Sequence, residues 1–334
     1  MQPALAWFLR FTVCGVSGMN LAHSQELVCD VMRPVLTRLP RGRGFLLGKL
    51  CGGLTEPWNR PRKRWRVFYD HSAKAWFTVD LCDYMERMHY YCGVRGDYWN
   101  AALIQAFLGP GDTYVDVGAN LGVHSLRASR AVGGSGRVYA FEPNPRTRLR
   151  LRLHAAMNDA RNIVIVELAL SDHEGEGSLR SGDGYNSGMF TLERHGLPEN
   201  SVAVRICRGD SILHSLTMSG RILVKIDVEG HELSVLRGMR GWLAAVEPML
   251  TVEITPAWLK QAGADASEVW RLFQELGYIG YMPLLKRRWN GDCLFRFQPL
   301  HFGEFAALSG QHDIFWARKS ERLPDELRFA LSKS

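Results

Sequence analysis

A loop with residue types suited to a small ligand follows a long apolar stretch about a third of the way along the chain. In YVDVGANLGVHS, residues 114–125, the positions that matter are Asp116, Gly118, Asn120 and Gly122. Glycines permit a tight turn and the close approach of a ligand, while Asp116 and Asn120 supply a carboxylate and an amide. Because a carboxylate repels phosphate and attracts ammonium, this loop suits the zwitterionic end of an amino acid.

A second carboxylate follows the next apolar stretch. Glu142, in VYAFEP, lies 26 residues beyond Asp116, close to where an acidic residue bonds the ribose of a bound nucleoside. An amino-acid end at one strand and a ribose at the next together predict S-adenosylmethionine. Taken singly, Asp116 could only cap the turn and Glu142 could only face water, but the two at this spacing favour the cofactor.

Phosphate-binding loops do not fit the same stretch. A dinucleotide loop requires GxGxxG, and here its second and third glycines are replaced by Asn120 and Val123. The GxxxxGK[ST] pattern is also absent from the sequence. A dehydrogenase is therefore an improbable function.

The densest charge in an apolar stretch is in RILVKIDVEGHE, residues 221–232. Side chains alternate along a strand, so Lys225, Asp227 and Glu229 are predicted to share one face, where they need partners or a ligand. We predict that Asp227 faces the sulfonium or acts as a base, and that Lys225 and Glu229 orient it or the acceptor hydroxyl. His231 is a second proton acceptor to consider. The alternative is a structural ion-pair network, with His231 merely opening the next helix.

Metal chemistry is not predicted. Asp227, Glu229, His231 and Glu253 could ligate a cation, but their spacing is not diagnostic of any metal site. We therefore predict no obligatory metal ion.

The elements that must position these residues alternate between strand and helix. Apolar strands are predicted at 113–118, 137–143, 162–170, 221–230, 248–254, 278–282 and 313–319, most with helical segments between them. This alternation predicts a doubly wound, Rossmann-type parallel sheet that binds ligands at the carboxyl ends of its central strands. Ahead of it, short strands at 66–70 and 75–81 and a helix at 83–93 are expected.

Charge separates the N-terminal segment from the rest of the 334 residues. Residues 1–66 contain eleven Arg and Lys against three acids, a net +8, so the remainder carries −1 of the total +7. We predict a basic, partly irregular extension over 1–66, irregular from 33 onward, and a small β/α subdomain over 67–110. A methyltransferase-like main domain over 111–320 and a tail over 321–334 complete the chain.

The start of the chain resembles a signal peptide only faintly, because Arg10 interrupts the apolar run and no basic region precedes it. A loosely docked helix is the preferred interpretation. Seven scattered cysteines predict neither a disulfide framework nor a structural zinc site, and favour a reducing cytoplasm. Peripheral membrane contact through the basic N-terminal segment is left open.

Five motifs in order, VDVGANLGVHSL, VYAFEPNP, LALSD, YNSGM and VKIDVEGHELSVLRGM, resemble the FkbM family of S-adenosylmethionine-dependent methyltransferases. The resemblance covers about residues 67–320. It implies a class I methyltransferase fold with a seven-stranded, mostly parallel sheet whose last strand, DIFWARK, is antiparallel. It also implies that Asp116, Gly118, Asn120 and Gly122 hold the methionine end, that Glu142 holds the ribose, and that Ser171 and Asp172 lie beside the adenine.

The predicted function is O-methylation of a hydroxyl on a sugar, glycan or secondary metabolite. The [DN]PP[YFW] signature of many nitrogen methyltransferases is missing at the fourth strand, which favours an oxygen acceptor. Two alternatives are considered: an RNA 2′-O-methyltransferase, which the neutral main domain disfavours, and a non-catalytic S-adenosylmethionine-binding module. The acceptor itself and the oligomeric state do not follow from the sequence.

Overall fold

The computed structural model describes residues 21–38, 46, 63–92, 97–181, 190–193, 201–287 and 293–329. The chain divides into two compact units. The smaller contains the residues up to Phe68 together with Thr78–Arg95 and the last two residues, and the larger contains Tyr69–Phe77 and Gly96–Ser332.

The smaller unit is built from helices and a hairpin. Its helices are α2 (Leu21–Arg38) and α4 (Tyr84–Cys92), and its hairpin strands are β1 (Trp65–Asp70) and β2 (Ala75–Asp80), whose tip belongs to the larger unit. The predicted hairpin and the helix after it are confirmed. The prediction of irregular chain from residue 33 is wrong at 33–38, where α2 continues through Pro34.

Burial explains why α2 tolerates a proline. Cys29 and Leu36 are fully buried on one side of α2, and Arg66 reaches Glu26 on the same side at 2.6 Å. These contacts offset an interior proline, which costs about 3 kcal/mol. Cys29 is also disulfide-bonded, which sequence spacing did not predict because pairing depends on proximity in space; Cys82, Cys207 and Cys293 are not part of a disulfide.

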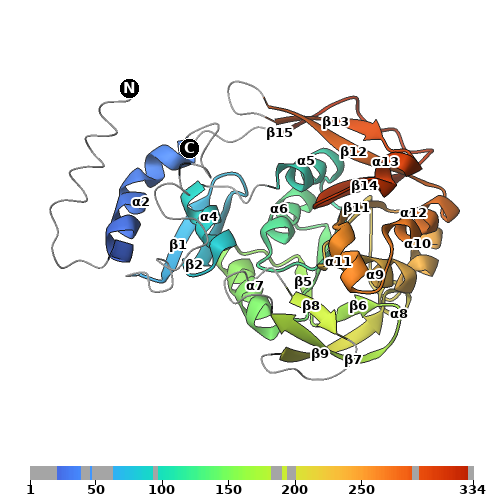
Figure 1. Ribbon diagram of the computed structural model, residues 1–334, viewed down its shortest axis with the longest axis horizontal. Coiled ribbons are helices and arrows are strands. Elements are labelled where there is room, and N and C mark those ends of the chain that lie inside the picture. The colour runs from blue at the N-terminus through green and yellow to red at the C-terminus, as the bar shows by residue number, and fades with distance from the viewer. Residues whose placement is uncertain are drawn as a thin grey trace. The chain divides into compact units, whose positions relative to one another are not determined.

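The larger unit is organised around one mixed sheet (Figure 1). Across the sheet the strands are β15 (Leu327–Phe329), β13 (Cys293–Pro299), β12 (Tyr278–Arg287), β14 (His312–Arg318), β11 (Met249–Ile254), β10 (Ile222–Ile226), β3 (Thr113–Val117), β4 (Arg137–Phe141) and β5 (Ile163–Val166). Strands β11, β10, β3, β4 and β5 pair in parallel, and β14 is antiparallel to β11 and β12. The class I order with an antiparallel last strand is confirmed, and β13 and β15 extend the predicted seven strands to nine.

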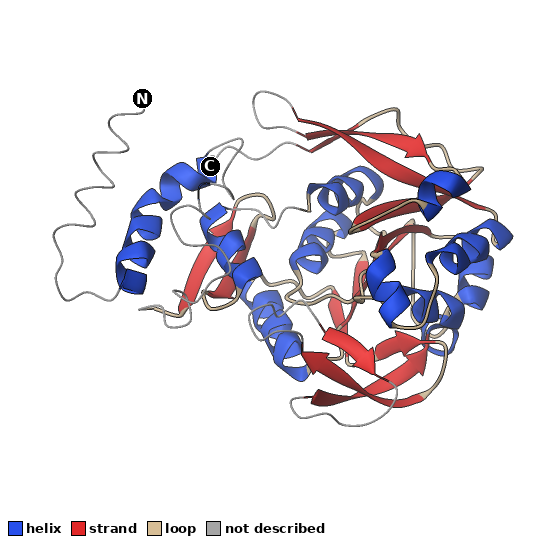
Figure 2. Cartoon of the chain, in the orientation of Figure 1, coloured by secondary structure: helices blue, strands red, loops and turns tan. Residues whose placement is uncertain are grey.

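Helices cover both faces of this sheet (Figure 2), and the central strands are therefore buried on both sides. Helices α5 (Tyr98–Phe107) and α6 (Val123–Val132) pack with Tyr114 and Leu223 on one face. Helices α9 (Glu232–Gly238), α10 (Arg240–Val246) and α12 (Ala266–Glu275) pack with Val115 and Val224 on the other. The remaining helices are α7 (Pro145–Met157), α8 (Gly209–Leu213), α11 (Pro256–Gln261) and α13 (Phe302–Ala306). In the described part of the chain, no helix is both long enough and apolar enough to cross a membrane.

A second, four-stranded sheet was not predicted. It contains β6 (Ala169–Ser171), β9 (Ser201–Arg208), β7 (Gly175–Ser181) and β8 (Phe190–Glu193), in that order, and lies low in Figure 2. The single strand predicted over 162–170 is therefore wrong, since β5 ends at Val166 and β6 pairs with β9. The glycines and charged residues of β7 hide the alternation that marks a strand. The YNSGM motif lies outside the described residues.

Candidate active site

The loop after β3 has the conformation that its glycines suggest. Gly118, Asn120 and Gly122 all have positive φ, at 84°, 50° and 81°. A Cβ at Gly118 would lie 1.9 Å from the carbonyl oxygen of Asp227. Only glycine therefore lets the loop after β3 approach the end of β10, and the two predicted groups of site residues meet at this point.

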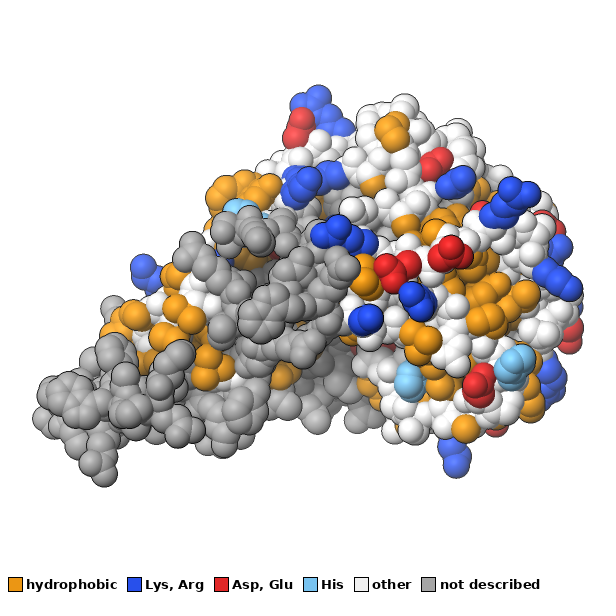
Figure 3. All heavy atoms as spheres, turned by 90° about the horizontal axis from the view of Figure 1, so that it is seen from above, with side chains coloured by type: hydrophobic (Ala, Val, Ile, Leu, Met, Phe, Trp, Pro, Cys, Tyr) orange, Lys and Arg blue, Asp and Glu red, His pale blue; other side chains and the backbone are white. Residues whose placement is uncertain are grey.

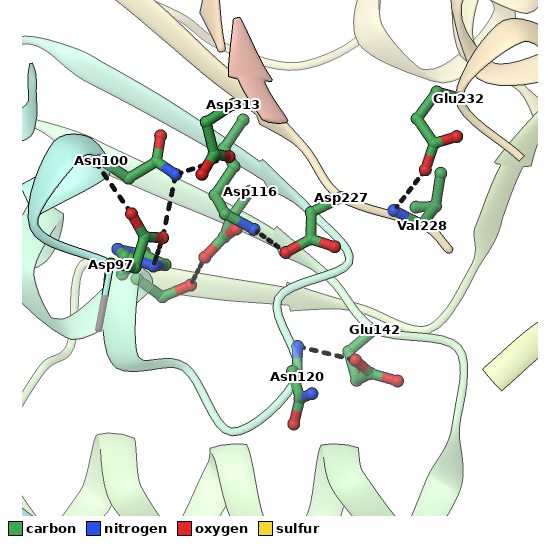
Figure 4. A network of polar contacts seen from close by, with 12 residues as sticks. Asp97, Asn100, Asp116, Asn120, Glu142, Asp227, Val228, Glu232 and Asp313 are labelled. Carbon is green, nitrogen blue, oxygen red and sulfur yellow. Dashed lines mark hydrogen bonds and ion pairs between the residues drawn. The ribbon is translucent and has the colours of Figure 1, made fainter. Parts of the chain in front are cut away.

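Glu142 is fixed against the same loop. Its carboxylate accepts hydrogen bonds from the backbone N–H of Asn120 at 2.8 Å (Figure 4) and of Asn144 at 2.9 Å. Burial outweighs these donors and raises the pKa of Glu142 to about 7. Each carboxylate oxygen has more than one lone pair, so Glu142 can still accept hydrogen bonds from the two hydroxyls of a ribose.

Asp116 has an unsatisfied oxygen in a buried place. The residue is 1% exposed, its Oδ2 accepts a hydrogen bond from Ser125 Oγ at 2.5 Å, and its Oδ1 has no partner among the described residues. The side-chain oxygen of Asn120 is also buried without a hydrogen-bond partner among the described residues. A buried acceptor without a partner costs about 1–3 kcal/mol, so these atoms fit a ligand that donates hydrogen bonds, such as the ammonium of S-adenosylmethionine.

Lys225 and Asp227 form an ion pair beside this loop. Lys225 Nζ lies 2.7 Å from Asp227 Oδ2, and the lysine side chain is 4% exposed. Burial would lower the pKa of Lys225, but Asp227 and Asp116 outweigh it and raise the pKa. Burial would likewise raise the pKa of Asp227, but Lys225 lowers it to about 2. Both groups are therefore charged.

Glu229 does not share the face of Lys225 and Asp227, which corrects the prediction of a strand to residue 230. Strand β10 pairs with its neighbours only as far as Ile226. The chain then turns, with Glu229 at φ 54° and Gly230 at φ 98°. Glu232 accepts hydrogen bonds from the backbone N–H of Val228 (Figure 4) and of Gly230. Burial and the charge of Asp227 raise the pKa of Glu229 to about 8.

His231 is joined to a different group of predicted residues. It opens α9, and its Nε2 lies 2.9 Å from Ser171 Oγ at the end of β6. Asp172 Oδ1 lies 3.2 Å from the same hydroxyl. His231 is thus brought together with the residues expected beside the adenine, rather than with the Lys225–Asp227 pair.

Further polar residues, which the sequence did not indicate, come from α5 and its N-cap, from α6 and from β14; Figure 4 shows Asp97, Asn100 and Asp313 among them. His124 Nε2 lies 2.7 Å from Asp97 Oδ2, and Asn100 Nδ2 donates to Asp97 Oδ2 at 2.9 Å and to Asp313 Oδ1 at 3.1 Å. On β11, Glu253 lies within hydrogen-bonding reach of Asp227. The only signal in the sequence was Asp97 as a helix cap, since Asp313, which accepts a hydrogen bond from Asn100, is 213 residues away from it.

A metal site does not emerge from these side chains. Within the described ranges, no three or more His, Cys, Asp and Glu side chains are placed to hold a metal ion together.

Comparison with known proteins gives a family. A protein-family model described as "Methyltransferase FkbM domain" matches residues 116–279. The chain is 30% identical over 201 residues to the hexuronic acid methyltransferase AglP of Haloferax volcanii, and the match covers 60% of this chain and 76% of the relative.

Solved methyltransferases are also similar. A methyltransferase FkbM structure from Methylobacillus flagellatus KT matches at 16% identity and a TM-score of 0.36, over 62% of this chain but only 43% of that chain. TYW2 of M. jannaschii, in complex with AdoMet, matches at 10% identity and a TM-score of 0.36, over 81% of this chain and 88% of that chain. With the family match and the curated relative taken together, the chain belongs to the FkbM family of S-adenosylmethionine-dependent methyltransferases.

Proposed function

We propose that this protein transfers a methyl group to a hydroxyl of a sugar, with a uronic acid or a glycan that contains one as the acceptor. The family supports methyl transfer, and a hexuronic acid methyltransferase among its relatives supports a sugar. The observation that carries the proposal is the meeting of the Gly118 loop, Glu142 and the Lys225–Asp227 pair at adjacent strand ends.

Each predicted cofactor residue has a proposed contact. Asp116 and Asn120 would receive the amino-acid end, Glu142 the ribose hydroxyls, and Ser171 and Asp172 the adenine. When bound, S-adenosylmethionine supplies a methyl group activated by its sulfonium. Asp227, ionised beside Lys225, would place a negative charge at this edge of the sheet.

Proton acceptance is assigned to Glu229. Asp227 has a pKa of about 2, which makes it a weak base, whereas the pKa of Glu229 is about 8. Glu229 is half-buried, makes no side-chain hydrogen bond to the described residues, and has a positive φ that bulky residues rarely adopt without a functional reason. A base of this pKa is suited to taking the proton of an acceptor hydroxyl near neutral pH.

Charge supports a small acceptor over RNA. Residues 67–334 sum to −1, and on the face shown in Figure 3 Lys and Arg side chains mix with Asp and Glu. A nucleic-acid enzyme concentrates basic residues beside its site.

The test is a titration followed by a transfer assay. The full chain and Glu142→Ala are titrated calorimetrically with S-adenosylmethionine, with NAD as the control ligand. Binding that the substitution weakens, without NAD binding, is expected. The wild type is then incubated with free uronic acids, matched neutral hexoses and RNA, and the methylated atom is mapped. Methylation of a uronate oxygen supports the proposal; a folded protein that binds no S-adenosylmethionine, or that methylates only RNA, contradicts it.

A further inference from the structure

The sheet face under α5 and α6 changes from apolar to polar toward the carboxyl end of β3. Strand register places Lys225 between Asp116 of β3 and Thr251 of β11, and Glu253 of β11 opposite Asp313 of β14. All of these side chains except Asp313 are less than 5% exposed. Lower on the same face, Tyr114 and Leu223 pack with α5 and α6.

Carboxyl groups outnumber basic groups in this layer. The carboxyl cluster, as we name it, consists of Asp97 at the N-cap of α5, Asp116 on β3, Asp227 after β10, Glu253 on β11 and Asp313 on β14. The basic groups that face it in the described structure are Lys225, paired with Asp227, His124 on α6, paired with Asp97, and Arg127 on α6, which Asp70 and Asp97 share. Asp116, Glu253 and Asp313 are left without a cation of their own.

Unsatisfied buried acceptors point to the kind of group that is missing. Asp116 Oδ1, Asn100 Oδ1 and Glu253 Oε1 are buried without a hydrogen-bond partner among the described residues, and each of these residues is at most 4% exposed. Buried carboxylates and amide oxygens without donors are satisfied by a ligand that brings N–H groups and positive charge.

We propose that the carboxyl cluster makes the site bind the positively charged cofactor in preference to its uncharged product, and that protons leave the site when the cofactor binds. This inference rests on the function proposed above. S-adenosylmethionine has a net charge of +1, from its ammonium and sulfonium against one carboxylate. Loss of the methyl group turns the sulfonium into a neutral thioether, so S-adenosylhomocysteine has a net charge of zero.

Electrostatic interactions determine how large the preference for S-adenosylmethionine is and how many protons are released when it binds. Burial and Asp97 raise the pKa of Asp313 to about 7, and burial and Asp227 raise the pKa of Glu253 to about 12. A bound cation favours the ionised carboxylate and lowers these pKa values. Asp313, about half protonated near pH 7 in the empty site, therefore releases up to about half a proton per molecule when the cation enters.

The experiment compares the two ligands on the full chain. S-adenosylmethionine and S-adenosylhomocysteine are titrated calorimetrically at pH 7 in buffers of different ionisation enthalpy, which gives the affinity and the number of protons released. We expect S-adenosylmethionine to bind about tenfold tighter, as one partly screened charge interaction predicts, and to release more protons than the product does.

Isosteric variants locate the effect. Asp313→Asn retains an oxygen for Asn100 and should reduce the preference for S-adenosylmethionine several-fold, with S-adenosylhomocysteine affinity nearly unchanged. Glu253→Gln retains the shape of a carboxyl that is uncharged near pH 7 and should reduce the preference less. Glu275→Gln, in the exposed pair with Arg240, is the control and should change neither. If either variant fails to fold, the comparison of the two ligands on the wild-type protein still tests the proposal. Equal affinity of the wild type for both ligands, or equal proton release, overturns this inference, whereas binding of neither ligand overturns the proposed function instead.

Discussion

At the scale of single residues, the spacing between Asp116 and Glu142 indicated a cofactor site more strongly than the two residue types did on their own. Structure places both against one loop, because Glu142 accepts the backbone N–H of Asn120. The sequence could not show that Asp116 Oδ1 is without a partner, since that depends on which atoms fold around it. The structure adds that Gly118 is required by the carbonyl of Asp227 as well as by its positive φ.

Gly118→Ala is expected to weaken S-adenosylmethionine binding at least tenfold. The new Cβ would lie 1.9 Å from a backbone oxygen and φ is +84°, so the loop must move, at a cost of about 1–3 kcal/mol. Calorimetric titration and thermal unfolding measure the two effects. Gly134→Ala, which adds a Cβ with no atom within 4 Å, is the control. Wild-type affinity in Gly118→Ala would mean that the loop does not hold the cofactor.

Glu229→Gln is expected to lower kcat about 100-fold at saturating cofactor, with little change in S-adenosylmethionine affinity, because it removes the proton acceptor. The wild-type rate should rise with pH up to about 8, the pKa of Glu229, and this rise should be absent from the variant. Steady-state kinetics from pH 6 to 9 measure both. Asp227→Asn tests Asp227 as the alternative base. If the rise of the rate with pH disappears in Asp227→Asn but persists in Glu229→Gln, Asp227 and not Glu229 is the proton acceptor.

At the scale of elements, strand ends were the weak point of the sequence predictions. The alternation in 221–230 correctly paired Lys225 with Asp227, but it did not show that β10 ends at Ile226, where pairing with β3 and β11 stops. Likewise, the apolar run 162–170 continues across two sheets. Apolar patterns report burial, whereas the partner strand decides where an element ends.

His231 tests one of these element contacts. It joins the start of α9 to the end of β6 through Ser171, so His231→Ala is expected to weaken cofactor binding several-fold and to leave kcat at saturating cofactor within about threefold of the wild type. A general base would instead contribute about 100-fold or more to kcat. Separate measurement of the cofactor dissociation constant and of kcat distinguishes a role of His231 in cofactor binding from a role as general base. A large loss of kcat with unchanged affinity would restore the histidine as the base.

At the scale of the whole molecule, buried carboxyls set how stability depends on pH. Burial raises the pKa of Glu142, Glu232 and Asp313 to about 7 and that of Glu229 to about 8. In the unfolded chain such carboxyls ionise near pH 4. Between these values the folded state binds more protons, so their contribution to stability is complete below about pH 4 and is lost as the pH rises through 7–8.

The free energy of unfolding of the cofactor-free protein is therefore expected to fall between about pH 4 and 8. Asp227, with its pKa lowered by Lys225 to about 2, acts in the opposite sense and loses its contribution below about pH 4, which leaves a maximum on the acidic side of neutrality. Denaturant unfolding at a series of pH values measures this curve. S-adenosylmethionine should reduce the fall, because its positive charge favours the ionised carboxylates, and Asp313→Asn should flatten it. A free energy that is constant or rises from about pH 4 to 8 would show that these carboxyls are already ionised in the empty site.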